Sequence, residues 1–517
     1  MAALWNLGNS ISQLSVLVTA SVQYLSMIPL RTTYKGYSTV ANVQAVAAFL
    51  KGAPYRKHPG VTALKTVHLP EELQRGALSI VHGAALRDLT EQARRLSNFL
   101  WSRKRPMDEE QLRERALAME KGLWEQEMES RTDTDSHLAE MHIRKKVLSA
   151  LKKTTYHWTP LRYDDELCLV YLAARLAAGY AAMRRALNEI KKRDPTFTPF
   201  SLLDFGSGLG TVVWAARTTW GDSLKESVCV DSSKAMNTLA ERLLRGGSDK
   251  EDPLIKHVYF RQFLPVSPKV QFDLVSSAFA LSELPSKQER IETVLTLWRK
   301  THSYLVLVEN GTKEGHQILM EARDTVLKGE EKTMDPSRPF VFAPCAHQLP
   351  CPKLAQQAQV PCNYPQPFCP LPLPGNREQE VEQFSYLVMA RQEPGVENAG
   401  LEWARLTGPV LRRPRHVHCQ LCCPDGELRR VVVTPSRHGR SAPPPPRYLG
   451  CYLGRYLAFF SSTHSLICCL PPPKQRRVPL RPEQRLWRSA ANHEARSGNH
   501  HGMKGPIQEG FQNTPLI

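Results

Sequence analysis

The spacing of apolar residues changes once along the chain, close to residue 200. Between residues 71 and 195 the apolar positions recur every three or four residues, and Ile143, Val147 and Leu151 show this helical period clearly. The helical pattern ends at Pro195, because proline lacks a backbone N–H and stops a helix. We therefore predict a helical domain over 71–195.

Beyond residue 200, short apolar runs alternate with helical patterns. The runs typical of strands are 202–203, 227–230, 257–260, 272–276 and 303–308, and the helical patterns that follow them are 211–218, 235–244, 287–299 and 315–327. This alternation predicts an α/β fold with a doubly wound parallel sheet. We assign this core to residues 196–335 and expect a final antiparallel pair of strands at 340–342 and 383–390.

The first 70 residues differ from the rest in composition. They hold six Lys or Arg residues and no Asp or Glu, among many Ser, Thr, Ala and Leu residues. Positive charge without acids is typical of organelle-targeting presequences. We interpret 1–70 as a mitochondrial presequence with a flexible N-terminus, and we expect the mature protein in the mitochondrial matrix. The apolar run 14–30 would also suit a secretory signal, but no basic segment precedes it.

The C-terminal end changes character at Ser441. The proline run 443–446 and the unpatterned basic residues after it predict a low-complexity, disordered tail over 441–517. Much of the formal net charge of +18 lies in this tail and in the first 70 residues. The folded body is therefore only mildly basic, and RNA contacts there need local patches. No apolar run reaches the roughly 20 residues of a transmembrane helix, and we expect a monomer without a membrane span.

Three alternate glycines form the most informative motif of the chain. They follow the first predicted strand in the sequence Asp204-Phe205-Gly206-Ser207-Gly208-Leu209-Gly210, where glycine permits a tight turn and a close approach to a ligand. The next strand ends in Asp231, where a carboxylate can accept hydrogen bonds from ribose hydroxyls. A dinucleotide-binding protein shows similar features. The leading Asp204 and the D-x-G-x-G-x-G form resemble the class I methyltransferase motif, in which the first acid and the glycine loop face the methionine part of S-adenosylmethionine. The resemblance favours this cofactor and a class I methyltransferase-type sheet.

We accordingly predict a cofactor site made of residues at the ends of three successive strands. These residues are Asp204, Gly206, Gly208 and Gly210 toward the methionine part, Asp231 toward the ribose and Gln262 toward the adenine. By the same analogy Ser277 and Ala278 would face the reactive methyl group. A glycine turn that binds nothing and a surface glutamine are the plainer explanations.

The residues expected of an active transferase are harder to find. Enzymes that methylate amino groups commonly place Asn/Asp-Pro-Pro-aromatic after the fourth strand, whereas this chain has Ser276-Ser277-Ala278-Phe279. Carbon-5 cytosine enzymes need a cysteine nucleophile, and no cysteine lies between Cys229 and Cys345. Glu283 is a candidate base, although such a carboxylate is more often a surface or capping residue. We therefore assign no catalytic residue and favour a binding protein that kept the fold.

The cysteines gather in the C-terminal part of the chain, where ten of the twelve lie beyond residue 344. Cys345, Cys351 and Cys362 have the spacing C-x5-C-x10-C, with Cys369 close by, and a second group begins at Cys419. In a reducing compartment clustered thiolates suit zinc or an iron–sulfur cluster. Buried thiols without a metal are the alternative. We assign a Cys-rich metal-binding extension with the final strands to residues 336–440.

Several stretches together carry a family resemblance. They are 152–158, Asp204 to Gly210, 261–269, 281–287, 308–313, 342–345 and 415–419. Over about residues 50–440 the chain resembles the mitochondrial methyltransferase-like proteins that act in assembly of the small ribosomal subunit. Beyond residue 440 it leaves the family pattern, so that 441–517 looks like a variant terminus.

The resemblance implies a protein that binds the immature mitochondrial small subunit and its ribosomal RNA, and so supports mitochondrial translation. It also implies a [4Fe-4S] cluster held by Cys345, Cys351, Cys362 and Cys422. An insert before Cys362 leaves Cys369 as the alternative third ligand, and zinc is the alternative metal. The resemblance speaks against methyl transfer, with an active S-adenosylmethionine-dependent rRNA methyltransferase as the alternative.

Two groups of basic residues suit contacts with RNA phosphates. Lys145, Lys146, Lys152 and Lys153 lie on one predicted helix, and Arg412, Arg413 and Arg415 precede the last cysteines. A solvated charged surface is the ordinary explanation of each group. The neighbouring His416 and His418, like His347, are candidate zinc ligands or exposed loop residues.

Overall fold

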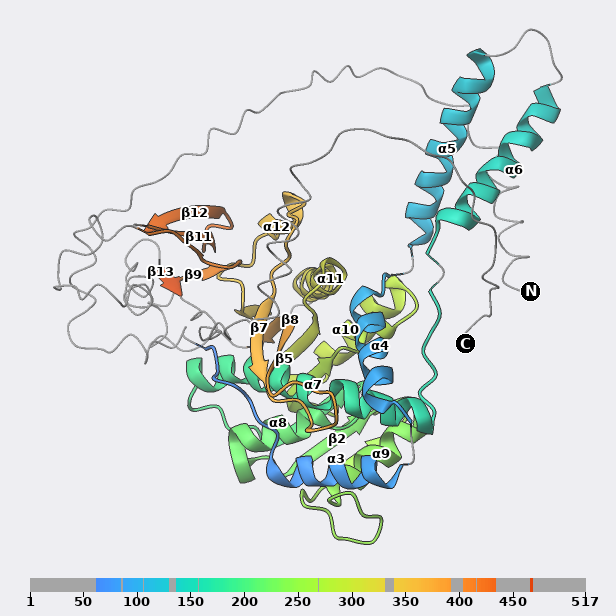
Figure 1. Cartoon of the computed structure of the whole chain (residues 1–517). Coiled ribbons are helices and arrows are strands. Elements are labelled where there is room, and N and C mark those ends of the chain that lie inside the picture. The colour runs from blue at the N-terminus through green and yellow to red at the C-terminus, as the bar shows by residue number, and fades with distance from the viewer. Residues whose placement is uncertain are drawn as a thin grey trace, which may run out of the picture. The chain divides into compact units, whose positions relative to one another are not determined.

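A computed structural model describes residues 62–433 apart from the gaps 85–86, 106, 130–135, 157, 268, 331–338, 392–402 and 415, and it also describes Ser465–Ile467. Nearly all of the predicted presequence and of the predicted tail therefore lie outside the described residues. The chain divides into two compact units (Figure 1), a larger one with the described residues of 59–340 and 363–392 and a smaller one with those of 341–362 and 393–467.

Helices occupy the N-terminal part of the larger unit, as the apolar period predicts. They are α3 (Glu71–Gly83), α4 (Leu89–Ser102), α5 (Glu109–Glu129), α6 (Ser136–Thr154) and α7 (Asp165–Arg193). The carboxylate of Asp164 caps α7 by accepting a hydrogen bond from the Leu167 amide at 2.9 Å. By length and composition α7 would suit a membrane span, but 67% of its apolar window is buried inside the protein, which is typical of a core helix.

A mixed sheet forms the centre of the larger unit. Its strands β1 (Ser201–Phe205), β2 (Glu226–Val230), β3 (Val258–Arg261), β4 (Phe272–Ala278) and β5 (Thr301–Asn310) are parallel, and β8 (Glu380–Ala390) is antiparallel to β5. The order of these strands is β3-β2-β1-β4-β5-β8. The strand β6 (Phe340–Ala343) begins where the chain passes from the larger to the smaller unit. An antiparallel strand next to β5 and a switch point beside β1 are the arrangement of a class I methyltransferase-type sheet, which confirms the predicted α/β fold.

Helices connect the parallel strands and cover the sheet (Figure 1). They are α8 (Thr211–Trp220), α9 (Lys234–Leu244), α10 (Lys287–Arg299) and α11 (Lys313–Glu330), with 3-10 turns η4 (Gly221–Ser223) and η5 (Leu281–Glu283). The strands β1, β2, β4 and β5 are largely buried on both faces, and Leu202, Leu203, Leu305 and Leu307 are fully inaccessible to solvent. Parallel strands covered on both sides read as continuous apolar runs, which is why the sequence pattern located them.

One strand of this sheet was not predicted. β7 (Tyr364–Phe368) lies in the Pro- and Cys-rich insert and pairs with β8 in antiparallel orientation, with Pro365 opposite Gln383 and Pro367 opposite Val381. Proline cannot donate a ladder hydrogen bond, so it is tolerated in a strand only at an edge or bulge. The two prolines alternate along β7, which leaves the amides between them able to pair.

The smaller unit contains a sheet of its own. Its elements are α12 (Pro352–Ala355), β9 (Trp403–Leu406), β10 (Leu411–Arg412), β11 (Val417–Cys422), β12 (Leu428–Val433) and β13 (Ser465–Ile467). The strand order is β10-β11-β9-β13, and β12 forms an antiparallel hairpin with β11. This unit carries the cysteines that the sequence singled out as metal ligands.

Candidate functional site

The glycine loop between β1 and α8 has the backbone shape that its sequence predicts. Gly206, Gly208 and Gly210 all have positive φ angles, of 68°, 48° and 70°, in the region that favours glycine. The amide of Gly206 donates to the Val230 carbonyl at 2.8 Å and so ties the loop to the end of β2. A Cβ added at Gly206 would lie 2.2 Å from the Cβ of Ala280, whereas one added at Gly208 would meet nothing within 4 Å.

Asp231 lies at the end of β2 and braces this loop. Its Oδ2 accepts a hydrogen bond from the Gly208 amide at 2.9 Å, and its Oδ1 accepts one from the Ser233 amide at 2.9 Å. Burial raises the pKa of the carboxyl, and the two backbone hydrogen bonds oppose that shift. Gln262 follows β3 and donates from Nε2 to the Ser232 carbonyl at 3.4 Å. The structure thus brings the predicted ribose and adenine residues together beside the loop.

Asp204, by contrast, lies beneath the loop. It is fully buried, and its Oδ1 accepts a hydrogen bond from the Ser276 hydroxyl on β4 at 2.9 Å. Burial raises its pKa to about 8, the Ser276 hydrogen bond lowers it, and the charge of Asp231 raises it further. Within the described residues, Oδ2 of Asp204 and the Ser277 hydroxyl are buried polar atoms without a hydrogen-bond partner. Asp204 therefore supports the strand ends from within.

The raised pKa of Asp204 predicts a pH dependence of stability. Because the folded state holds the proton more tightly than the unfolded chain, the stabilisation is complete below about pH 4 and is lost as the pH rises toward 8. We expect the free energy of unfolding, from urea titrations between pH 5 and 8, to fall with a slope of at most about 1.4 kcal/mol per pH unit from this group. The Asp204→Asn variant should lose that slope, and parallel pH profiles for the two proteins would contradict the assignment.

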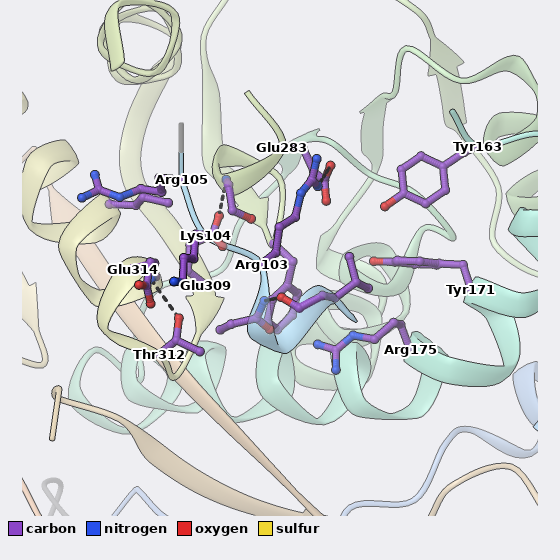
Figure 2. Close-up of a pocket in the computed structure, with 16 residues that line it drawn as sticks. Arg103, Lys104, Arg105, Tyr163, Tyr171, Arg175, Glu283, Glu309, Thr312 and Glu314 are labelled. Carbon is purple, nitrogen blue, oxygen red and sulfur yellow. Dashed lines mark hydrogen bonds and ion pairs between the residues drawn. The ribbon is translucent and has the colours of Figure 1, made fainter. Parts of the chain in front are cut away.

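A pocket opens at the ends of β4 and β5 (Figure 2), and none of the six predicted cofactor residues lines it. Burial raises the pKa of two of its lining residues, Tyr163 and Tyr171, and both lie close enough to Asp231 for that carboxylate to raise it further. The pocket is lined by residues of α4 and the segment after it, of α7, and of the loops after β4 and β5. The lining includes Arg103, Arg105, Tyr163, Tyr171, Arg175, Phe279, Glu283 and Glu309. Its volume of about 30 Å³ holds no more than one or two water molecules.

Opposite charges are balanced around this pocket. Arg103 forms an ion pair with Glu283, the residue that the sequence offered as a base. Arg175 makes two hydrogen bonds to Glu382, at 2.9 and 3.2 Å, and its guanidinium lies 4.7 Å from the centre of the Phe279 ring. Three described arginines therefore face carboxylates, since Arg105 also contacts Glu321 at 2.6 Å.

Glu309 is a second buried carboxyl beside the pocket. It is the penultimate residue of β5, is 1% exposed, and accepts a hydrogen bond from the Ser282 amide at 3.1 Å through Oε1. Burial raises its pKa to about 7, with hydrogen bonds from Ser282 acting in the opposite direction. We did not predict Arg175 or Glu309 as pocket residues. A charged residue inside an apolar helix, and one at the end of an apolar strand, were the available signals.

The four cysteines predicted as metal ligands all belong to the smaller unit. Burial raises the pKa of Cys362 and of Cys422, and in both cases the neighbouring thiols of Cys345 and Cys351 raise it further. The four sulfurs are therefore close enough to interact electrostatically. Among the described residues, no three or more His, Cys, Asp or Glu side chains are arranged to hold a single metal ion.

Two polar side chains lie within this group of thiols. The ring Nε2 of His347 is 3.1 Å from the Cys422 sulfur, and its Nδ1 is 3.1 Å from the Leu349 carbonyl oxygen. The ammonium of Lys353 is buried and donates to the carbonyls of Val360 and Pro361 at 3.1 and 3.2 Å, and also to that of Thr407. Lys353 thus closes the loop that joins Cys351 to Cys362.

The remaining candidate thiols have other surroundings. Cys369 belongs to the larger unit, where its sulfur is 3.9 Å from the His68 ring and burial together with Glu378 raises its pKa. Burial alone raises the pKa of Cys419 to about 12, without a contribution from another thiol. Neither residue shares the electrostatic environment of the other four.

The chain is similar to known proteins in sequence and in structure. The family model described as mitochondrial small ribosomal subunit Rsm22 matches residues 165–442. A human protein named "Ribosome assembly protein METTL17, mitochondrial" is 52% identical over 402 residues, which are 78% of this chain and 85% of that protein. The Rsm22-cox11 tandem protein 2, mitochondrial, of Schizosaccharomyces pombe is 24% identical over 54% of this chain and 41% of its own length.

Solved structures with a similar sheet include two methyltransferases. One is a SAM-dependent methyltransferase from Aquifex aeolicus, with 14% identity, a TM-score of 0.25, and coverage of 32% of this chain and 88% of that one. The other is magnesium protoporphyrin IX methyltransferase from Synechocystis, with 12% identity and a TM-score of 0.25. The similarity covers 46% of this chain and 90% of that one. The fold assignment itself rests on the strand order given above.

Proposed function

The chain belongs to the Rsm22 family of mitochondrial small ribosomal subunit proteins, and on that premise we propose that it is an assembly factor of the mitochondrial small ribosomal subunit. It binds the immature subunit and its ribosomal RNA, and so supports mitochondrial translation. The observation that carries this proposal is the 52% identity, over 78% of the chain, to a human protein named as a mitochondrial ribosome assembly protein. Since the curated relatives are named as mitochondrial, we place the protein in the mitochondrial matrix, acting as a monomer.

The larger unit is proposed to bind S-adenosylmethionine at the glycine loop. Asp231 would hold the ribose, Gln262 the adenine, and the loop with Asp204 beneath it the methionine part. The positive φ angles of the loop and the open space beside Gly208 support this fit, as do the unsatisfied buried oxygens of Asp204 and Ser277. When bound, the cofactor would supply a methyl group on a sulfonium centre.

Loss of one carboxylate tests that cofactor site. Asp231→Asn removes a charge that would accept hydrogen bonds from the ribose, so we expect calorimetric affinity for S-adenosylmethionine to fall about tenfold or more. Asp252→Asn makes the same chemical change at an exposed position in the loop before β3 and should leave the affinity unchanged. Equal affinities for wild type and Asp231→Asn would contradict the assignment, as would no binding by the wild type.

We propose that the protein does not transfer the methyl group. The pocket at the ends of β4 and β5 is narrow, its arginines are paired with carboxylates, and Glu283 is held by Arg103. A base engaged in an ion pair is poorly placed to take a proton from a substrate. An active S-adenosylmethionine-dependent rRNA methyltransferase is the alternative, and it would require this pocket to open.

The smaller unit is proposed to hold a [4Fe-4S] cluster through Cys345, Cys351, Cys362 and Cys422, with zinc as the alternative. The effect of Cys345 and Cys351 on the pKa of both Cys362 and Cys422 supports this ligand set, because a bound cation offsets the repulsion between thiolates. The same effect favours Cys362 over Cys369 as the third ligand. When bound, the cluster would cross-link the segment 345–362 to β11 and so stabilise the unit.

Complementation of cells that lack the protein separates a role in subunit assembly from methyl transfer to ribosomal RNA. We expect both wild type and Asp231→Asn to restore the small-subunit peak in sucrose gradients, with identical ribosomal RNA methylation maps by mass spectrometry. A methyl mark present only with the wild type would establish the enzyme alternative. Crosslinking that recovers no small-subunit ribosomal RNA would overturn the assembly proposal.

A further inference from the structure

One face of the sheet in the smaller unit combines exposed arginine side chains with half-buried histidine side chains. Along β11 the residues Val417, Cys419 and Leu421 are buried, while His418 and Gln420 alternate with them toward the other face. The strand register places His418 opposite Leu411 of β10 and Gln420 opposite Arg430 of β12. We call this surface, with the adjoining Arg413 and His416, the β11 face; β11 and β12 are labelled in Figure 1.

Two imidazole rings form the centre of the β11 face. The rings of His416 and His418 pack edge to face with centroids 4.8 Å apart. Partial burial lowers the pKa of His418, and the nearby charges of Arg430, His416 and Arg413 lower it further. The guanidinium of Arg430 lies 3.3 Å from Nδ1 of the same ring. The two packed rings are thus bordered by guanidinium groups.

The positive charge of the β11 face is not neutralised within the part of the chain that is described. Arg413 and Arg430 are exposed, and no described carboxylate forms an ion pair with either of them. The next residue on β12 behaves differently, because Arg429 pairs with both Asp425 and Glu427. The acids of the hairpin therefore gather at its turn, away from the imidazole pair.

We propose that the β11 face binds a single-stranded segment of RNA. The arginines contact the phosphates, and an unpaired base stacks on the imidazole pair, which is how proteins commonly combine charge and ring stacking in RNA recognition. An acidic protein would engage the arginines but leave the stacking surface unused. This inference rests on the proposed function and deepens it, because it names the surface and the form of RNA that it takes.

Fluorescence anisotropy with the full chain, purified without oxygen, tests the charge component. The probes are a labelled single-stranded RNA of about 20 nucleotides, the same RNA annealed to its complement, and labelled polyglutamate. We expect Arg413→Ala combined with Arg430→Ala to weaken single-strand binding about tenfold or more. The slope of log affinity against log salt concentration should become shallower by about 0.7 for each arginine removed. The matched control Arg429→Ala removes a paired arginine from the same strand and should change affinity less than about twofold.

The stacking component has its own variants. His416→Ala combined with His418→Ala should weaken binding of the single strand about tenfold or more, with little effect on the duplex, since only unpaired bases expose their faces. His416→Phe combined with His418→Phe keeps two rings and should retain most of the affinity. Circular dichroism and thermal melting verify that each variant is folded.

Four results would overturn the proposal. They are folded alanine variants that bind the single strand like the wild type, equal loss in Arg429→Ala, equal affinity for duplex and single strand, and binding of polyglutamate in place of RNA. Crosslinking to the small subunit in cells separates this inference from the proposed function. Wild-type crosslinks that survive in all face variants sink only the surface assignment, whereas their absence in the wild type sinks both.

Discussion

Gly206→Ala is expected to destabilise the larger unit by about 3 kcal/mol or more. A residue with a Cβ at a φ of 68° is itself strained by roughly 1–2 kcal/mol. In addition, the new Cβ would lie 2.2 Å from the Cβ of Ala280, so one of the two backbones must move. The measurement is urea denaturation monitored by circular dichroism, together with calorimetry of S-adenosylmethionine binding, which should be lost.

Two further variants separate strain from collision. Gly208→Ala sits at a φ of 48° but meets no atom within 4 Å, so only the strain of roughly 1–2 kcal/mol is expected. Ala280→Gly removes the colliding Cβ, and the double variant with Gly206→Ala should recover part of the lost stability. If Gly206→Ala and Gly208→Ala cost the same, Ala280 does not press against the loop as the structure describes.

Cys422→Ser is expected to abolish cluster binding. Serine keeps the size of the side chain but replaces a soft thiolate with a hard oxygen, which binds iron in such clusters poorly. Protein purified without oxygen should fall from about four irons per chain to nearly none, losing its brown colour and absorbance. We also expect lower thermal stability of the smaller unit, because its two cysteine-bearing segments would no longer be cross-linked.

Cys419→Ser is the matched control on the same strand. Cys419 is buried, as Cys422 is, but no other thiol contributes to the pKa of Cys419. The Cys419→Ser variant should therefore retain iron and sulfide. Likewise, Cys362→Ser should lose its iron, whereas Cys369→Ser should retain it. A colourless wild type that contains zinc would refute the cluster, and iron lost equally in Cys419→Ser would refute the ligand set.

The core of the fold could be predicted from the sequence because its signals are local. Strands β1, β2, β4 and β5 are largely buried on both faces, so each is a short, mostly apolar run, and a helical period follows. The edge strand β3 alternates between half-buried and exposed positions. The glycine loop could be predicted from the sequence, because alternate glycines after a strand are typical of a tight turn. The structure confirms the turn with positive φ angles at Gly206, Gly208 and Gly210. β7 escaped prediction because Pro365 and Pro367 argue against a strand unless its position at the edge is known.

The pocket could not be predicted because its residues come from distant parts of the chain. Arg103 meets Glu283, and Arg175 meets Glu382, across more than 170 residues in each case. A single sequence offers these side chains as separate charges, each of which would ordinarily be solvated. Burial then decides their chemistry, as it does for Glu309, whose pKa of about 7 arises from the core around it.

By itself, the sequence determined the α/β core, the glycine loop with Asp231 beside it, and the gathering of cysteines near the C-terminus, because hydrophobic period, glycine and thiol chemistry are properties of neighbouring residues. Only the tertiary structure decided that Asp204 lies beneath the loop, that Cys362 and Cys422 share one electrostatic environment, and that His418 and Arg430 share a face of β11. Contacts between distant segments determine which side chains are buried, and burial in turn shifts the pKa of each ionisable group.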